Sequence, residues 1–111
     1  NFNFGGFVVF TEGGRTARKL SRYRAEAPIF VFAPNEKVRD SLTVNYGVFP
    51  FVQPKIFKKG QPVRLDDMKN AISYLKKIEV FDDSKYYILL YGDNWMVEGR
   101  VSTIKVITPS K

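Results

Sequence analysis

Short apolar runs alternate along the chain with stretches of helical periodicity, and this alternation is the main structural signal. The first runs lack polar alternation, which is typical of strands that a sheet buries on both faces. Between the runs, apolar residues recur at helical spacing, most clearly at Met68, Ala71, Leu75 and Ile78. The pattern predicts five strands, at residues 6–10, 29–32, 48–52, 86–91 and 103–107, and three helices, at residues 16–23, 35–45 and 66–78.

The order of these elements predicts the fold class. Strands that alternate with helices form a mostly parallel sheet with helices on both faces. The last two strands are joined without a helix, so the fifth strand should run antiparallel to the fourth. Pro50 interrupts the third strand and places it at a sheet edge. Residues 1–111 therefore predict a single three-layer α/β domain with a five-stranded, mostly parallel sheet and an antiparallel last strand.

The turn from Thr11 to Thr16 carries the strongest functional signal in the chain. It joins a buried strand to a helix through Gly13 and Gly14, a geometry in which backbone N–H groups at the helix start converge on an anion. The two threonine hydroxyls add donors, and the guanidinium of Arg15 can hold a phosphate at two points. A structural explanation stays open, because a sharp strand-to-helix turn also favours glycine.

A second loop is predicted at the same end of the sheet. Ligands of open α/β sheets bind beyond the carboxyl ends of the strands, where the strand order reverses. The loop at residues 92–99 follows the fourth strand and contains Trp95, so it should converge with the first turn. Arg100 is a further candidate for contacting phosphate, and a solvated loop arginine is the competing explanation.

Composition narrows the function classes. The chain has no Cys and no His, which excludes disulfides, thiolate nucleophiles and Ser-His-Asp triads. No apolar run is long enough to span a membrane, so we expect no membrane partner, and a cytoplasmic location fits the lack of Cys. The pairs Asp66–Asp67 and Asp82–Asp83 are explained by capping and not by acid–base chemistry. Because the chain starts at Asn1 directly before an apolar strand, we expect further sequence upstream.

The net charge of +7 is unevenly distributed. Five cations crowd the predicted first helix and its end: Arg15, Arg18, Lys19, Arg22 and Arg24. On a helix, Arg15, Arg18 and Arg22 share the face opposite the side that carries Ala17 and Leu20. Such a face is typical of nucleic-acid binding. The aromatic residues, however, lie largely in the apolar strands and are explained as core. A solvated helix face is therefore preferred, and no nucleic-acid partner is expected.

Several blocks of this sequence resemble the C-terminal domain of pyruvate kinase. The longest block contains the glycine turn and the basic helix, and the others follow in the order found in that family. The blocks are FVVFTEGGRTARKLSRYR at residues 7–24, API at 27–29, NEKV at 35–38, YGVFP at 46–50 and STIKV at 102–106. Together they extend over nearly the whole chain.

The resemblance implies a role in a larger enzyme. Pyruvate kinase transfers a phosphoryl group from phosphoenolpyruvate to ADP with magnesium and usually potassium, and its catalytic residues belong to a (β/α)8 barrel that this sequence lacks. The chain alone should be non-catalytic and hold no cofactor. By resemblance it is a regulatory and assembly domain, whose partners are the catalytic barrel, further copies in a homotetramer, and a sugar phosphate or nucleotide effector.

The resemblance also assigns the effector's phosphate to the glycine turn, where the matching residues are Thr11, Gly13, Gly14, Arg15 and Thr16. The loop after the fourth strand, in contrast, departs from the family pattern. In the family, a carboxylate at the position of Glu12 goes with insensitivity to sugar bisphosphates. Electrostatics predicts an effect in the same direction, since a like charge about 6 Å from a phosphate costs roughly 3 kcal/mol of binding free energy at an effective dielectric near 20. A Glu12 side chain turned toward Arg15 or Arg18 would reduce that cost.

Two other functions stay open. A free-standing domain of the same fold would bind a nucleotide or sugar phosphate without any barrel attached. Nucleic-acid binding through the basic helix would instead show an affinity that falls steeply with salt.

Overall fold

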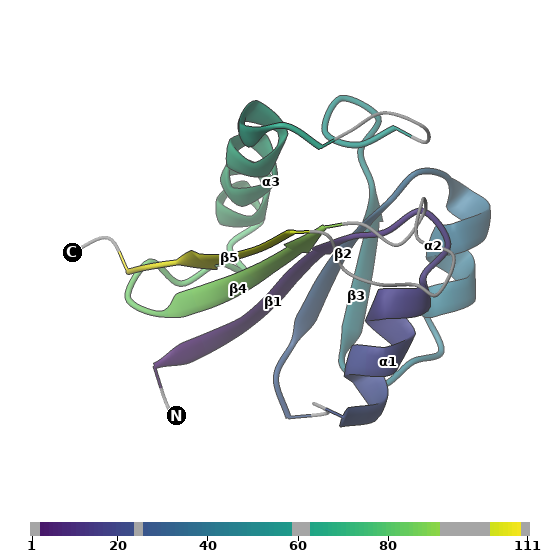
Figure 1. Cartoon of the computed structure of the whole chain (residues 1–111), viewed down its shortest axis with the longest axis horizontal. Helices are drawn as coiled ribbons and strands as arrows, with labels where there is room; N and C mark the ends of the chain where they lie inside the picture. Colours follow the sequence, from purple (N-terminus) through teal and green to yellow (C-terminus); the bar gives the residue numbers. More distant parts are fainter. Residues whose placement is uncertain (1–2, 24–25, 59–62, 92–102, 110–111) are drawn as a thin grey trace.

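The computed structural model of the chain describes residues 3–23, 26–58, 63–91 and 103–109. Along the chain the elements are β1 (Phe4–Phe10), α1 (Arg15–Tyr23), β2 (Ile29–Ala33), α2 (Glu36–Leu42), β3 (Val48–Val52), α3 (Leu65–Lys77), β4 (Tyr86–Tyr91) and β5 (Thr103–Ile107). The strands form one sheet in the order β3-β2-β1-β4-β5 (Figure 1). Strands β1 to β4 are mutually parallel and β5 is antiparallel to β4. The predicted α/β fold with a five-stranded, mostly parallel sheet is confirmed, as is the edge position of β3.

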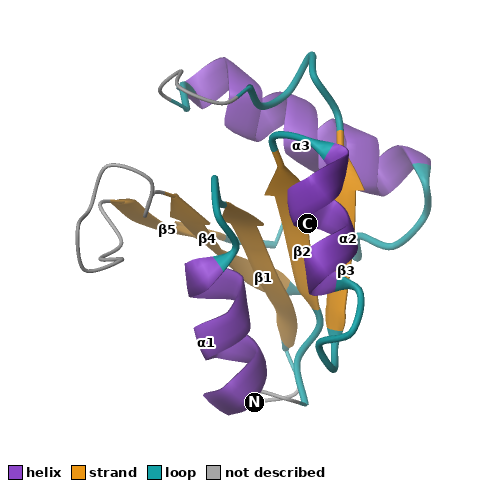
Figure 2. Cartoon of the chain, turned by 90° about the vertical axis from the view of Figure 1, so that its right-hand side faces the viewer, coloured by secondary structure: helices purple, strands orange, loops and turns teal. Residues whose placement is uncertain are grey.

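Helices cover both faces of the sheet, as predicted. Figures 1 and 2 show α3 on one side and α1 with α2 on the other. Alternate residues of β1 serve the two sides: Val8 and Phe10 belong to the core beneath α3, whereas Phe7 and Val9 belong to the core beneath α1 and α2. The unbroken apolar sequence of β1 is thus explained by burial on both faces.

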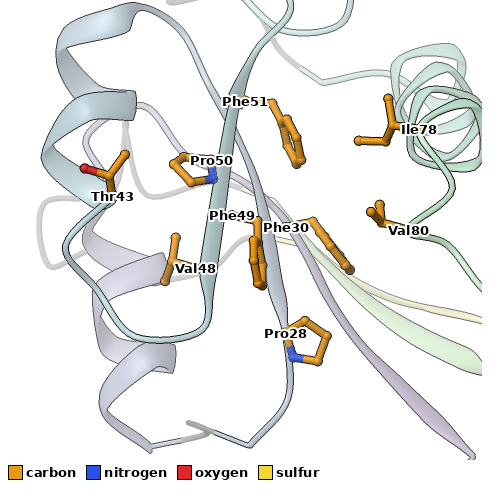
Figure 3. Close-up of a pocket in the computed structure, with 9 residues that line it drawn as sticks. All are labelled: Pro28, Phe30, Thr43, Val48, Phe49, Pro50, Phe51, Ile78 and Val80. Atoms are coloured by element: carbon orange, nitrogen blue, oxygen red, sulfur yellow. The ribbon is translucent and has the colours of Figure 1, made fainter.

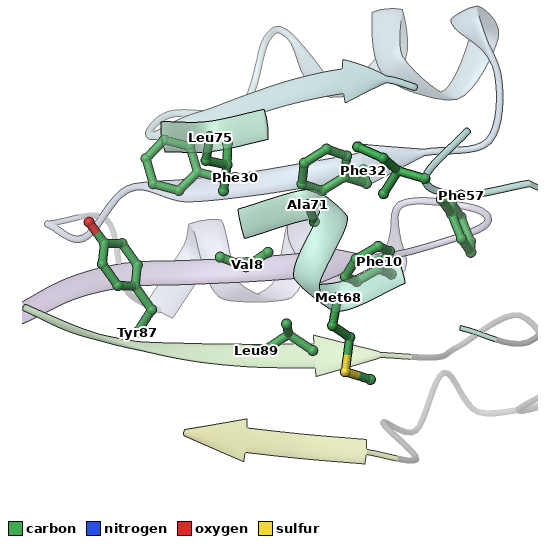
Figure 4. Close-up of a cluster of buried hydrophobic side chains, with 11 residues drawn as sticks. Val8, Phe10, Phe30, Phe32, Phe57, Met68, Ala71, Leu75, Tyr87 and Leu89 are labelled. Atoms are coloured by element: carbon green, nitrogen blue, oxygen red, sulfur yellow. The ribbon is translucent and has the colours of Figure 1, made fainter. Parts of the chain in front are cut away.

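Aromatic side chains fill much of the core on the α3 side (Figure 4). The rings of Phe10 and Phe32 stack with their centroids 5.4 Å apart, and Phe57 meets Phe10 edge-on at 5.7 Å. Tyr74 of α3 contacts Phe32 in the same way at 6.1 Å. Such pairs stabilise a core beyond the area they bury. The aromatic richness of the sequence is therefore a property of the core.

Helix α2 is shorter than the sequence predicts. It begins after Asn35, whose Oδ1 accepts the N–H of Val38 at 2.9 Å, as expected of an N-cap. It ends at Leu42, whereas the prediction extended it to residue 45. At Thr43 both the N–H (3.3 Å) and the hydroxyl (2.8 Å) donate to the carbonyl of Asp40. These bonds compete with the next helical hydrogen bond and so end the helix.

Strand β1 begins at Phe4, earlier than predicted, and its first residues contain a bulge. Phe4 pairs with Tyr86 and Gly6 with Tyr87, so Gly5 has no partner residue on β4. The ring of Tyr87 occupies the space where a side chain at Gly5 would lie, and its hydroxyl accepts the N–H of Asp82 at 2.8 Å. Sequence analysis placed the strand start at Gly6 and missed the bulge.

Three of the four paired carboxylates make structural contacts, in agreement with the prediction. Asp67 accepts the N–H of Arg64 at 2.9 Å ahead of α3. Asp82 accepts both the hydroxyl of Ser84 at 2.6 Å and its N–H at 2.9 Å, and these hydrogen bonds hold the pKa of Asp82 below its usual value. Asp83 forms an ion pair with Lys76 at 3.0 Å.

Candidate anion-binding site

Residues 11–16, here called the anion loop, lie at the point where the strand order reverses. Strand β1 is central, with β2 on one side and β4 on the other. Its last residue, Phe10, is in register with Phe32 of β2 and with Tyr91 of β4. Helix α1 leads from β1 to β2, whereas the chain reaches β4 only after β3 and α3. This is the place at which open α/β sheets bind their ligands.

Thr11 holds the anion loop in shape. Its side chain is 1% exposed, and its Oγ1 accepts the N–H of Gly14 at 2.8 Å. Gly14 has a φ of +91°, a conformation that other residues rarely adopt. The carbonyl of Gly14 then accepts the N–H of Arg18 at 3.0 Å, which begins the helical hydrogen bonding of α1. The Thr11 hydroxyl, predicted as a phosphate donor, is thus turned into the loop itself.

The side chain of Arg18 ties the anion loop to helix α2. Its Nη1 donates to the carbonyl of Gly13 and its Nη2 to Oγ of Ser41, both at 3.0 Å. Ser41 in turn donates to the carbonyl of Val38 at 2.7 Å. Sequence analysis grouped Arg18 with the basic helix face and missed this tie. No motif signals it, since Ser41 lies 23 residues further along the chain.

The outer surface of the anion loop is open at Gly13. A Cβ atom placed on Gly13 would meet no atom of the described residues within 4 Å, and neither Gly13 nor Arg15 is buried. Thr16, in contrast, is only 6% exposed. The structure therefore presents the backbone of Gly13 and the side chain of Arg15 to solvent, and turns the two threonines inward.

Next to the anion loop, the cations of α1 border a hollow of about 290 Å³, here called the basic groove. Its lining residues are Arg15, Arg18, Lys19 and Arg22. The opposite side of α1 buries Ala17 and half-buries Leu20, so the predicted basic face is confirmed. Glu12 is half-buried at the start of the loop. Arg18, which donates to Gly13 and Ser41, is not its ion-pair partner within the described residues.

A second hollow, here called the apolar groove, lies at the β3 edge of the sheet (Figure 3). It has a volume of about 620 Å³ and lies between β2, β3 and the end of α3. Its lining includes Pro28, Phe30, Phe51 and Val80, and also Phe49, which is 49% exposed. Sequence analysis did not predict this groove, because residues from three separate elements form it.

Three predicted features lie outside the described residues: the loop at residues 92–99 with Trp95, Arg100, and Arg24 of the basic segment. The last described residue before that loop, Tyr91 of β4, lies in register with Phe10 of β1. Within the part of the chain that the structure describes, no three His, Cys, Asp or Glu side chains are grouped to hold a metal ion. In the same described part, no helix has the length and apolar character needed to cross a membrane.

Fold and loop together define a doubly wound α/β domain with a glycine turn at its switch point. Comparison with known protein families identifies the family, since the family model described as "Pyruvate kinase, alpha/beta domain" matches residues 1–107. The chain therefore belongs to the family of the pyruvate kinase alpha/beta domain. This match confirms the resemblance to pyruvate kinase that the sequence indicated.

Individual relatives agree with this assignment. A pyruvate kinase of Clostridium perfringens is 46% identical over 101 residues, which cover 89% of this chain and 20% of that protein. One of Corynebacterium glutamicum is 37% identical over 99 residues, with coverage of 89% and 20%. A crystal structure of a pyruvate kinase from Cryptosporidium parvum shares the fold with a TM-score of 0.74 at 21% identity, covering 97% of this chain and 20% of that one. The chain thus spans about a fifth of the length of these relatives.

Proposed function

We propose that this chain is the effector-binding and assembly domain of a pyruvate kinase, and that the phosphate group of an effector binds at the anion loop. The observation that carries the proposal is the open backbone at Gly13, located at the switch point of the sheet. An anion there approaches the start of α1, where helix geometry directs N–H groups outward. Arg15 supplies a charge-assisted contact from the same turn.

Each residue of the loop has a distinct part in this proposal. Gly13 lets a phosphate reach the backbone, and Arg15 neutralises its charge. Thr11, Gly14 and Thr16 act from within, by keeping the turn in the conformation that binds. Glu12 lowers the affinity for phosphate by charge repulsion. The contribution of Arg100 stays a prediction from the sequence.

The regulatory consequence follows from linkage. An effector that binds one arrangement of the loops better than another shifts the protein toward that arrangement, and with it the contacts between subunits. We propose β5 as an assembly surface, because this edge strand exposes Ile104 (66%) and Val106 (61%). The assembled enzyme would be a homo-oligomer that transfers a phosphoryl group from phosphoenolpyruvate to ADP with magnesium and potassium held outside this domain.

For the catalytic barrel of such an enzyme, we propose the apolar groove as the contact surface. The relatives are about five times longer than this chain, which spans 20% of their length, so most of their polypeptide lies outside this domain. A groove lined by Phe49, Pro28 and Val80 is typical of a surface that another domain covers. Pro50 lacks an N–H group, which disfavours pairing with a further strand at this edge.

Calorimetric titration of the chain tests the effector site. The ligands are fructose bisphosphates, ribose 5-phosphate, AMP and inorganic phosphate, each at low and at moderate salt. We expect saturable binding that Arg15→Ala abolishes and that Lys69→Ala preserves, since Lys69 is an exposed cation on the distant helix α3. Glu12→Lys should tighten binding. If neither the chain nor Glu12→Lys binds any of these ligands, the proposed effector site is wrong and assembly remains the domain's role.

A further inference from the structure

Helix α1 has an unusual charge composition for its length. Its nine residues include four cations and no acidic residue. All four cations border the basic groove, and Arg15, Lys19 and Arg22 are exposed. They lie three or four positions apart, so their side chains project along one line of the helix surface.

This arrangement opposes the stability of the helix. Cations repel one another at spacings of three and four residues, and cations near a helix start oppose the helix dipole. Helix α3 has the favourable arrangement, with Asp66 and Asp67 in its first turn and Lys76 and Lys77 in its last. Helix α1 has no acid in its first turn and begins with Arg15. The stability of the fold therefore does not explain the row of cations on α1.

Among the described residues, no carboxylate neutralises the far end of the row. Lys19 and Arg22 have no ion-pair partner among the residues that the structure describes. Carboxylates elsewhere are engaged with other cations, as in the pair of Asp40 with Arg39 and that of Asp83 with Lys76. The end of the row remote from the anion loop is thus positively charged, exposed and continuous with the proposed phosphate site through Arg15.

We infer that the basic groove is the second half of the effector site and that its ligand carries a linear chain of phosphates. The inference rests on the proposed function of the anion loop and extends it. Arg15 and Arg22 are seven positions apart on α1, about 10 Å along the helix axis, so a single phosphate reaches only one end of the row. Guanidinium groups pair with phosphate oxygens in a bidentate manner, and two of the three exposed cations, Arg15 and Arg22, are arginines.

A phosphate chain also overcomes the repulsion by Glu12. A lone phosphate at the anion loop would bind in the same turn as Glu12, whereas the further phosphates of a chain would bind beside Lys19 and Arg22, seven and ten positions further along the chain. Inorganic tripolyphosphate and the triphosphate of a nucleotide share this chemistry. The groove is therefore expected to discriminate by the number of phosphates in the chain.

The test is calorimetric titration of the chain with inorganic phosphate, tripolyphosphate and ATP. We expect tripolyphosphate to bind at least about tenfold more tightly than phosphate, since each added charge-assisted contact contributes about that factor. The double variant Lys19→Ala/Arg22→Ala should lose this gain and keep the affinity for phosphate. The matched control is Lys69→Ala/Lys77→Ala on α3, which removes the same charge from exposed positions and should keep the gain. Equal gains for ATP and tripolyphosphate mean that the phosphate chain alone is recognised, and a larger gain for ATP identifies a nucleotide; both results support the inference.

Other results overturn it. Equal affinities for phosphate and tripolyphosphate, or a gain that survives in the Lys19→Ala/Arg22→Ala variant, contradict the inference; the effector site itself stands if Arg15→Ala abolishes phosphate binding. Phosphate binding that is insensitive to Arg15→Ala contradicts the proposed function instead. A mixed-sequence single-stranded oligonucleotide that binds the groove more tightly than tripolyphosphate would assign the groove to nucleic acid. Absence of tripolyphosphate binding in both the chain and Glu12→Gln also overturns the inference.

Discussion

Strand β1 has a pair of glycines at each end, and the two pairs have different surroundings. At Gly5 a Cβ atom would lie 2.3 Å from Cζ of Tyr87, and at Gly6 it would lie 2.5 Å from the carbonyl oxygen of Pro28. At Gly13, beyond the other end of the strand, it would meet nothing within 4 Å. The first pair is glycine because neighbouring atoms occupy the space. In the second pair, only Gly13 leaves such space unoccupied by the described residues.

Within the second pair, only one glycine is required by the backbone. Gly14 has a φ of +91°, and a Cβ there would lie 3.1 Å from Arg18 and Leu42. Gly13 has neither a positive φ nor a crowded Cβ position. Structure therefore explains three of the four glycines, and the proposed phosphate site would explain the fourth, because a ligand there approaches the backbone of Gly13. The following variants test this contrast.

The largest effect is expected for Gly5→Ala. The new methyl group would overlap the ring of Tyr87, which also stacks on the ring of Phe81 with centroids 4.1 Å apart. Overpacking of this kind should lower the free energy of unfolding by about 3 kcal/mol, measured by urea denaturation. The double variant Gly5→Ala/Tyr87→Leu should recover part of the loss. A loss below about 1 kcal/mol in the single variant would show that the crowding is easily relieved.

Gly14→Ala should have an intermediate effect. Its positive φ and the contacts with Arg18 and Leu42 should lower the free energy of unfolding by about 1–2 kcal/mol. Urea denaturation of this variant beside Gly13→Ala provides the comparison. Equal stability of the two variants would contradict the distinction drawn here between the glycines.

Tyr87→Phe tests the crowded end without changing its volume. The variant leaves the N–H of Asp82 without its acceptor and should cost about 1 kcal/mol. Burial raises the pKa of Tyr87 above its ordinary value near 10, so the neutral phenol is favoured in the folded state. The neutral phenol of Tyr87 therefore contributes fully to stability below the ordinary tyrosine pKa, and this contribution is lost as the pH rises through the higher pKa of the folded state. Denaturation at alkaline pH should show this loss in the parent chain, and Tyr87→Phe should lack that component.

The smallest effect on stability is expected for Gly13→Ala. Its methyl group would project into open space, so the free energy of unfolding should change by less than about 0.5 kcal/mol. Binding of inorganic phosphate should nevertheless weaken, because the methyl group obstructs the approach to the backbone. Calorimetry on the folded variant separates the two effects. Unchanged binding would remove the functional explanation for this glycine.

The sequence predicted the fold well because its strongest signals are local. The apolar run of β1 and the helical stripe of Met68, Ala71 and Leu75 each report burial directly, and both elements lie where expected apart from the earlier start of β1. The end of α2 was missed because the hydroxyl of Thr43 competes for the carbonyl of Asp40. That competition depends on side-chain rotamers, which hydrophobic periodicity does not contain.

Of the candidate site, the sequence predicted the position and not the internal contacts. Glycines after a buried strand placed the anion loop at the correct end of the sheet. The bond of Arg18 to Ser41, the inward turn of Thr11 and the bulge at Gly5 were not predicted. Each depends on residues that tertiary packing brings together, so each required the structure.

The most direct test of the account is a record of the backbone amide chemical shifts of the chain and of Glu12→Gln during titration with inorganic phosphate. We predict saturable shifts at Gly13, Gly14 and Arg15, larger at a given phosphate concentration in Glu12→Gln, with Gly5 and Gly6 unchanged as internal controls. Shifts confined to other regions, or no saturable shift at the anion loop in either protein, would contradict the assignment of this turn as a phosphate site.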